Sequence, residues 1–156
     1  SLMGDLDPNV LLYKSAGAGF LPGVKKALED GADVHAINDD ALRWASSKGH
    51  YDVVEILLDH GADIHAEDNY ALRFASLRGH YDIVALLLDN GADIHAIGDY
   101  ALRYASEYGH YDVVTLLLEK GANVHAENDL SLQFASKNGH DDVVKLLKKW
   151  MEKDES

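Results

Sequence analysis

The sequence predicts an all-α solenoid, in which helix-turn-helix repeats with short hairpin loops stack on one another. The first observation is a period of 30 residues without insertions: a Gly-Ala-Asp/Asn-Val/Ile-His-Ala segment begins at residues 31, 61, 91 and 121. The second is that an Ala/Ser-Leu-Arg/Gln-aromatic-Ala-Ser segment follows ten residues later in each copy. The third is a glycine at each expected helix end. One such helix pair cannot bury both of its faces, so the units must stack.

The first helix of each repeat carries its apolar residues on one face. Leu72 and Ala75 lie three residues apart, as do their counterparts in the other repeats. A short Asx side chain precedes each helix, and its oxygen can accept a hydrogen bond from an unpaired amide of the first turn. We therefore expect N-caps at Asp39, Asn69, Asp99 and Asp129, and helix ends at Gly49, Gly79, Gly109 and Gly139.

The second helix is apolar around more than one face. In the first full repeat it runs from Val53 to Leu58 and stops before Gly61. This pattern is typical of a helix buried between neighbours on both sides.

The predicted organisation has a capping unit at each end of the array. Pro22 fits the first turn of a second helix in the divergent N-terminal unit. At the other end, Lys148 replaces the leucine of the preceding repeats. The expected divisions are an N-terminal extension (1–7), an N-terminal capping repeat (8–30), three internal repeats (31–120), a C-terminal capping repeat (121–153) and a tail (154–156).

Composition narrows the functional classes. The chain of 156 residues has 14 Lys and Arg against 27 Asp and Glu, a net charge of −13, which disfavours binding to nucleic acids or anionic membranes. It has no cysteine, so disulfides, thiolate metal sites and a cysteine nucleophile are excluded. No apolar stretch approaches a membrane span or a signal peptide. We expect an intracellular, cytoplasmic protein.

The repeated segments resemble the ankyrin repeat. The resemblance rests on a Leu-x-x-Ala first helix, a Gly-His turn, a Val-Val-x-x-Leu-Leu second helix and a Gly-Ala-Asp-Val-x-Ala hairpin, over roughly residues 8–150. It implies a curved solenoid whose hairpins and first helices form a concave surface that binds other proteins. The usual ankyrin period is about 33 residues. The missing three residues predict a shortened hairpin, as in the ankyrin repeats of giant viruses or in a designed consensus array. A viral origin would imply the host cytoplasm.

The candidate binding residues are those that vary between repeats, because folding leaves such positions free. Aromatic and aliphatic side chains among them are the usual anchors of protein interfaces. On the face that the resemblance implies, the candidate partner-binding residues are Ile37, Asp40, Lys48, Tyr70, Leu77, Arg78, Ile97, Tyr100, Glu107 and Tyr108. Neutral surface variation is the alternative interpretation.

Repetition argues against catalysis and against a metal site. Eight of the nine histidines recur at two fixed positions of the repeat, and successive layers are too far apart for four of them to meet one ion. His80 and Asp82 have no nucleophile at a strained turn beside them. We expect no enzymatic activity, no cofactor and no metal.

Two repeated columns have competing interpretations. Arg43, Arg73 and Arg103, with Gln133 in the last repeat, form either a cationic ladder for a carboxylate ligand or pairs with acids such as Asp39 or Asp68. Trp44, Phe74, Tyr104 and Phe134 are expected to be core between repeats.

The sequence therefore predicts a monomeric, non-catalytic module that binds another protein. The three central repeats hold −10 of the net charge of −13, so a partner with a basic patch is expected. The alternative is a designed or consensus scaffold without a natural partner. The resemblance also implies possible hydroxylation by an asparaginyl hydroxylase, at His65, His95 and His125.

Overall fold

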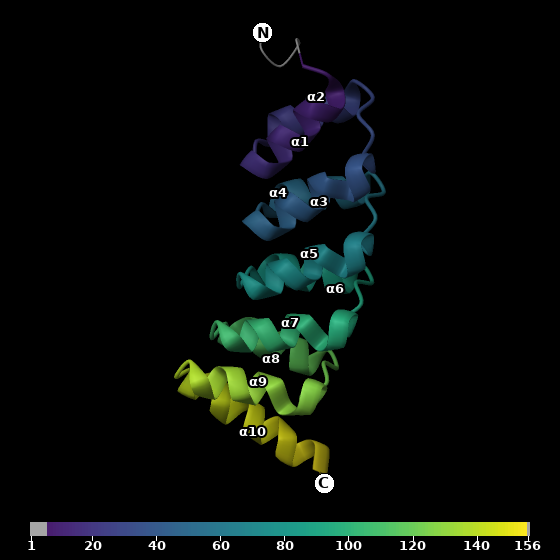
Figure 1. The fold of residues 1–156 in the computed structure, drawn as a ribbon. Coiled ribbons are helices and arrows are strands. Elements are labelled where there is room, and N and C mark those ends of the chain that lie inside the picture. Colours follow the sequence, from purple (N-terminus) through teal and green to yellow (C-terminus); the bar gives the residue numbers. More distant parts are fainter. Residues whose placement is uncertain (1–5, 156) are drawn as a thin grey trace. The chain divides into compact units, whose positions relative to one another are not determined.

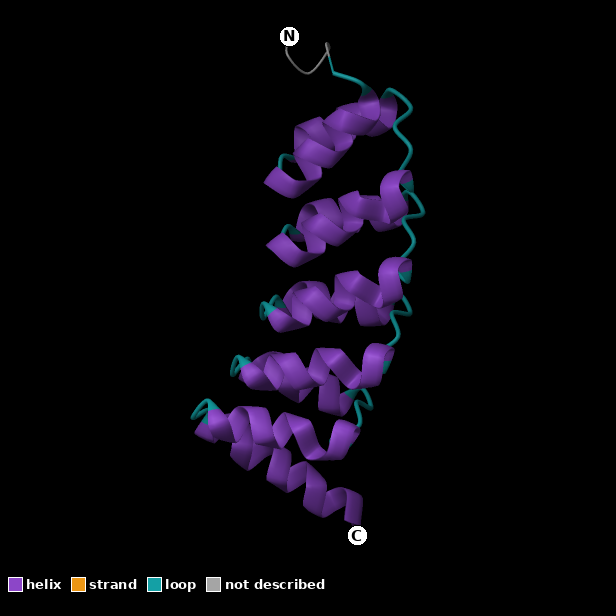
Figure 2. Cartoon of the chain, viewed as in Figure 1, coloured by secondary structure: helices purple, strands orange, loops and turns teal. Residues whose placement is uncertain are grey.

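The computed structural model describes residues 6–155, and these contain ten helices and no strand. Figure 2 shows that only loops and turns join the helices. The prediction of an all-α fold is confirmed. The helices are α1 (Pro8–Ala18), α2 (Leu21–Glu29), α3 (Ala36–Lys48), α4 (Tyr51–Asp59), α5 (Ala66–Leu77), α6 (Tyr81–Asp89), α7 (Ala96–Glu107), α8 (Tyr111–Glu119), α9 (Ala126–Lys137) and α10 (Asp141–Glu155).

The chain divides into two compact units, and the division falls within α5. Unit 1 is Ser1–Ala71 and unit 2 is Leu72–Ser156. In unit 1, α1 packs on both α2 and α3, and α3 packs on α4 (Figure 1). In unit 2, α7 packs on both α8 and α9, and α9 packs on α10. Within each unit, neighbouring helix pairs therefore pack on one another.

Local sequence signals set the helix ends. The side chain of Asp7 accepts a hydrogen bond from the amide of Asn9 at 2.8 Å and so caps α1, which has Pro8 in its first turn. Gly19 and Gly49 end α1 and α3 with positive φ angles of 72° and 88°, a conformation that glycine adopts readily. Two residues connect α1 to α2 and α3 to α4, and three residues connect α5 to α6, α7 to α8 and α9 to α10.

The core of each unit consists of the apolar columns seen in the sequence. The largest fully buried side chains of unit 1 are Leu12, Leu42, Leu57, Val24, Val53 and Val54, and those of unit 2 are Leu72, Ile83, Leu87, Leu102, Leu117 and Leu147. Burying one such side chain contributes roughly 1.5–3 kcal/mol. The first and second helices thus share one core in each unit.

The last helix differs from the other second helices. It has 15 residues, whereas α4, α6 and α8 have nine each. It continues through Glu155, past residue 153, where we expect the last repeat to end. Part of the predicted N-terminal extension, residues 1–5, and the final residue of the predicted tail lie outside the described residues. No helix within 6–155 is both long enough and apolar enough to span a bilayer.

Candidate functional site

Each internal first helix opens with a turn of left-handed backbone. In α3, the φ angles of Ile37, Asn38 and Asp39 are 51°, 52° and 57°. The same turn occurs at residues 67–69, 97–99 and 127–129. Left-handed helical backbone costs roughly 1–2 kcal/mol per L-residue and is especially unusual for a β-branched residue such as isoleucine. Such a turn persists only where the surrounding structure holds it.

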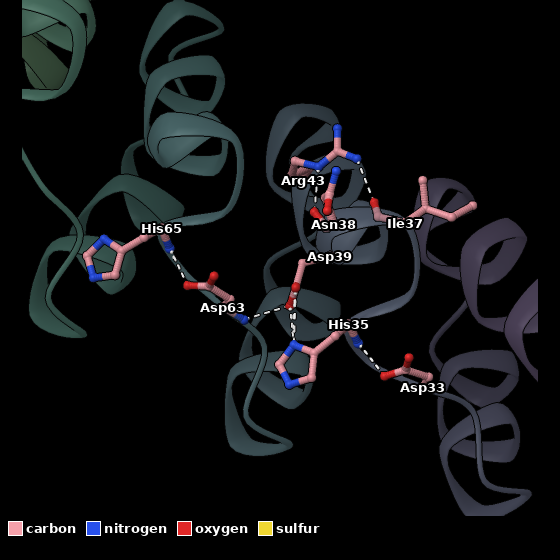
Figure 3. Close-up of polar contacts among 8 residues, drawn as sticks. All are labelled: Asp33, His35, Ile37, Asn38, Asp39, Arg43, Asp63 and His65. Carbon is pink, nitrogen blue, oxygen red and sulfur yellow. Dashed lines mark hydrogen bonds and ion pairs between the residues drawn. The ribbon is translucent and has the colours of Figure 1, made fainter.

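Arginine side chains hold these turns. Arg43 donates from Nε to the carbonyl oxygen of Asn38 and from Nη2 to that of Ile37, both at 2.9 Å (Figure 3). Arg103 makes the same two bonds, to Gly98 at 2.8 Å and to Ile97 at 2.7 Å.

The last repeat keeps a reduced form of this arrangement. Gln133 donates one bond, to Asn128 at 2.8 Å. Among the described residues, no carboxylate lies within ion-pair distance of Arg43 or Arg103. The expectation that these arginines pair with acids is therefore wrong for the two, because the guanidinium groups bond backbone carbonyls instead.

Asp39 links one loop to the next. Its carboxylate lies 3.0 and 3.1 Å from Nδ1 of His35 and accepts a bond from the amide of Asp63 at 2.6 Å (Figure 3). Asp99 repeats the pattern in unit 2, with His95 and the amide of Asn123. The predicted N-cap role is wrong for Asp39 and Asp99, because these bonds, and not the amides of the following turn, take up the carboxylates.

The charge of Asp39 strengthens its contact with His35 in unit 1. Hydrogen bonding to Asp39, followed by the attraction of its charge, raises the pKa of His35 above the usual 6.5. In the intervening repeat, Nδ1 of His65 lies 3.1 Å from the neutral side chain of Asn69.

The histidines of the Gly-His turns join successive helix pairs. Nε2 of His50 lies 3.1 Å from the carbonyl oxygen of Gly17. In unit 2, Nε2 of His110 and of His140 lie 2.8 Å from the carbonyl oxygens of Leu77 and Glu107. These histidines are structural. Within 6–155, no group of three or more His, Asp or Glu side chains is arranged to hold a metal ion.

Aromatic side chains and arginines form a continuous cluster in unit 2. The rings of Tyr100 and Tyr104 lie 4.2 Å apart, and Phe74 and Phe134 extend the row at 5.8 Å on either side. The guanidinium groups of Arg73 and Arg103 lie 4.9 and 5.7 Å from the ring of Tyr100. Burial raises the pKa of the Tyr100 phenol. Ring packing and cation–π contacts therefore link these side chains to one another.

Unit 1 presents a different set of side chains on α3. Asp40, Trp44 and Lys48 succeed one another at intervals of four residues, so they share one face of the helix. The Lys48 ammonium lies 5.8 Å from the centre of the Trp44 ring, and Arg43 lies 5.3 Å from the ring of Tyr70. Asp40 is buried, whereas Trp44 is 36% exposed.

The predicted partner-binding residues are distributed over both units. Ile37, Lys48, Arg78, Ile97 and Tyr108 are exposed, with Ile37 at 76% and Tyr108 at 54%. Tyr70, Leu77, Tyr100 and Glu107 are half-buried, and Asp40 is buried. Within each unit separately, we call the members of this set, together with Trp44 in unit 1 and Tyr104 in unit 2, the first-helix face of that unit. Unit 1 contributes Ile37, Asp40, Trp44, Lys48 and Tyr70, and unit 2 contributes the remaining residues.

Trp44 is 36% exposed, which corrects the expectation that it lies in the core between repeats. The sequence feature that indicates this exposure is the residue thirty positions before Trp44. Phe74, Tyr104 and Phe134 each have an aromatic residue thirty positions earlier, whereas Trp44 has the exposed Lys14 of α1. Within the described part of the chain, Trp44 makes no ring contact with α1.

The three histidines considered for hydroxylation lie between the helix pairs. His65 and His95 are exposed, and His125 is half-buried. Nδ1 of His125 lies 2.6 Å from Asp129, and its Nε2 lies 3.3 Å from Asp154. Their modification stays a prediction.

Comparison with known families agrees with this repeat geometry. The family model described as "Ankyrin repeats (3 copies)" matches residues 11–98 and again residues 72–155. The chain belongs to the ankyrin repeat family. Ankyrin repeats are typically protein-interaction modules and are usually non-catalytic, and the matching family is not an enzyme family. No curated protein matches the chain.

Proposed function

We propose that this ankyrin repeat protein is a non-catalytic module whose first-helix face binds another protein. The observation that carries the proposal is the exposure of apolar anchors on rigid backbone. Ile37 and Ile97 stand on left-handed turns held by arginine, and Tyr108 ends the helix that carries the Tyr100–Tyr104 pair. Pre-organised anchors lose little conformational entropy when they bind.

The experiment compares two matched sets of tyrosines. Tyr70, Tyr100 and Tyr108 belong to the first-helix face, whereas Tyr51, Tyr81 and Tyr111 begin second helices and are 38%, 40% and 46% exposed. Each set is changed to alanine in the full chain, and folding is checked by circular dichroism and urea unfolding. The wild type and both variants are then used to capture proteins from a cell extract, and the captured proteins are identified by mass spectrometry.

Three results are possible. A protein retained by the wild type and by the second-helix variant, but lost by the first-helix variant, supports the proposal. Loss only in the second-helix variant moves the site to the other face. Capture of nothing by any form favours the alternative of a designed or consensus scaffold without a natural partner.

A further inference from the structure

Asp40 interrupts a column of large side chains. At the same position, the later repeats have Tyr70, Tyr100 and Leu130. Asp40 is only 6% exposed. Among the described residues its carboxylate has no side-chain hydrogen-bond partner and no ion pair, although the amide of Ala41 bonds it and the charges of Arg43 and Asp39 act on it.

The charge of Asp40 is poorly compensated. Burial raises the pKa of its carboxyl above the usual 3.8, and the nearby charge of Asp39 acts in the same direction. Arg43 attracts the carboxylate but uses its Nε and Nη2 donors on carbonyl oxygens. A buried carboxylate without an ion-pair partner is costly, and the tyrosine of the next two repeats would avoid that cost. The charge of Arg43 and the amide of Ala41 offset only part of that cost, because the pKa of the carboxyl is still raised.

The adjacent turn of α3 provides a surface that already holds a cation. Trp44 lies four residues after Asp40, and its ring is 36% exposed. The Lys48 ammonium lies 5.8 Å from the centre of this ring. An indole face is the best of the aromatic faces for a cation. Asp40 and Trp44 thus offer a carboxylate and a ring face on the same side of one helix.

We propose that Asp40 and Trp44 together receive a cationic side chain, an arginine or lysine within a basic segment of a partner protein. This rests on the proposed function and specifies the partner's chemistry in unit 1. Residues 1–71 contain five Lys and Arg against thirteen Asp and Glu, a net charge of −8, so the unit attracts a basic segment. The incoming cation neutralises Asp40 and takes the place of the Lys48 ammonium over the ring. Arginine suits the site better than lysine, because its planar group stacks and bonds a carboxylate at once.

The test uses the full chain with Trp150→Phe, which leaves Trp44 as its only tryptophan. The probe is the hexapeptide Gly-Arg-Gly-Arg-Gly-Arg, acetylated and amidated at its ends, and its affinity is measured from Trp44 fluorescence at low salt. The same peptide with citrulline in place of arginine keeps the shape but not the charge. Asp40→Asn removes the buried charge at nearly constant volume, and Asp40→Tyr installs the residue of the following two repeats. Asp59→Asn is the matched control, because it removes one charge from the exposed end of α4.

We expect the arginine peptide to bind, and the citrulline peptide to bind much more weakly. Asp40→Asn and Asp40→Tyr should each weaken binding at least fivefold, because a charge-assisted bond is lost. Asp59→Asn should weaken it less than twofold. Equal effects of Asp40→Asn and Asp59→Asn would show that only net charge matters and would overturn the proposal. So would equal binding of the two peptides, or no fluorescence change at millimolar peptide.

Failure of this inference can be told apart from failure of the proposed function. If proteins captured through Tyr70, Tyr100 and Tyr108 bind equally well to Asp40→Asn, the first-helix face binds a partner but Asp40 is not part of the contact. If nothing is captured through that face, the proposed function itself fails.

Discussion

At the scale of single residues, the arginines of the first helices act on the backbone. Arg43 and Arg103 each bond two carbonyl oxygens of a left-handed turn and also lie beside tyrosine rings. A charged donor that satisfies a carbonyl contributes roughly 1.5–3 kcal/mol. This contribution offsets part of the cost of the left-handed turn that it holds.

Replacing one arginine should expose that contribution. Arg103→Gln keeps one carbonyl bond, as Gln133 does in the last repeat, but loses the second bond and the charge. We expect a loss of about 1.5–3 kcal/mol in the free energy of unfolding, measured with urea. The control, Gln133→Leu, removes one neutral bond and should cost about 1 kcal/mol. Unchanged stability in Arg103→Gln would mean that the turn needs no support from the side chain.

The link between His35 and Asp39 should make stability depend on pH. Bonding to Asp39 raises the pKa of His35 above 6.5, so the folded chain binds this proton more tightly than the unfolded chain. The stabilisation is complete below pH 6.5 and is lost as pH rises through the raised value. We expect His35→Gln to destabilise the protein more at pH 6 than at pH 9, measured by urea unfolding.

An exposed histidine without a carboxylate partner provides the control for this pH effect. Nδ1 of His60 lies 2.9 Å from the carbonyl oxygen of Ile56. His60→Gln is therefore the matched variant. If the cost of His35→Gln changes no more between the two pH values than the cost of His60→Gln does, the ion pair does not contribute.

At the scale of elements, the Gly-His turns join neighbouring helix pairs by close contact. A Cβ on Gly109 would lie 2.5 Å from Nδ1 of His140, so no side chain fits there while the histidine keeps its bond to Glu107. Gly139 has the same φ angle of 73°, but a Cβ there would meet nothing within 4 Å. Substitutions at these two glycines therefore distinguish the cost of backbone strain from the cost of steric contact.

Alanine at these two glycines should give different results. Both variants adopt the unfavourable positive φ, which costs an L-residue roughly 1–2 kcal/mol. Gly109→Ala must also displace the His140 ring, and overpacking of this kind costs about 1–3 kcal/mol. We expect Gly109→Ala to be the less stable of the two by that amount in urea unfolding. Equal stability would show that the His140 ring moves without cost.

The helices could be predicted from the sequence, whereas the start of each first helix could not. The spacing of Leu72 and Ala75, repeated every 30 residues, indicates the helical face directly. The sign of φ at residues 37–39 depends instead on bonds from Arg43, five and six residues further along. Gly98 and the Asx residues of these turns adopt positive φ more readily than other residue types, but Asx residues equally favour an N-cap, so the sequence pattern does not decide between the two.

At the scale of the whole molecule, the recurring and the varying positions of the 30-residue repeat give different information. Positions that recur identify the family, because they build the core. Positions that vary indicate candidate contacts, and Ile37, Ile97 and Tyr108 are exposed in the structure. The surroundings of Trp44 could not be predicted from the equivalent residues 74, 104 and 134, because they depend on the divergent first repeat.

The left-handed turns have a spectroscopic consequence for the whole chain. Twelve residues of the described helices have positive φ, in four groups of three. Circular dichroism adds signed contributions, and backbone of opposite hand contributes with opposite sign. The helix content calculated from ellipticity at 222 nm should therefore be lower than the helix content assigned from the backbone hydrogen bonds, even when every molecule is fully folded.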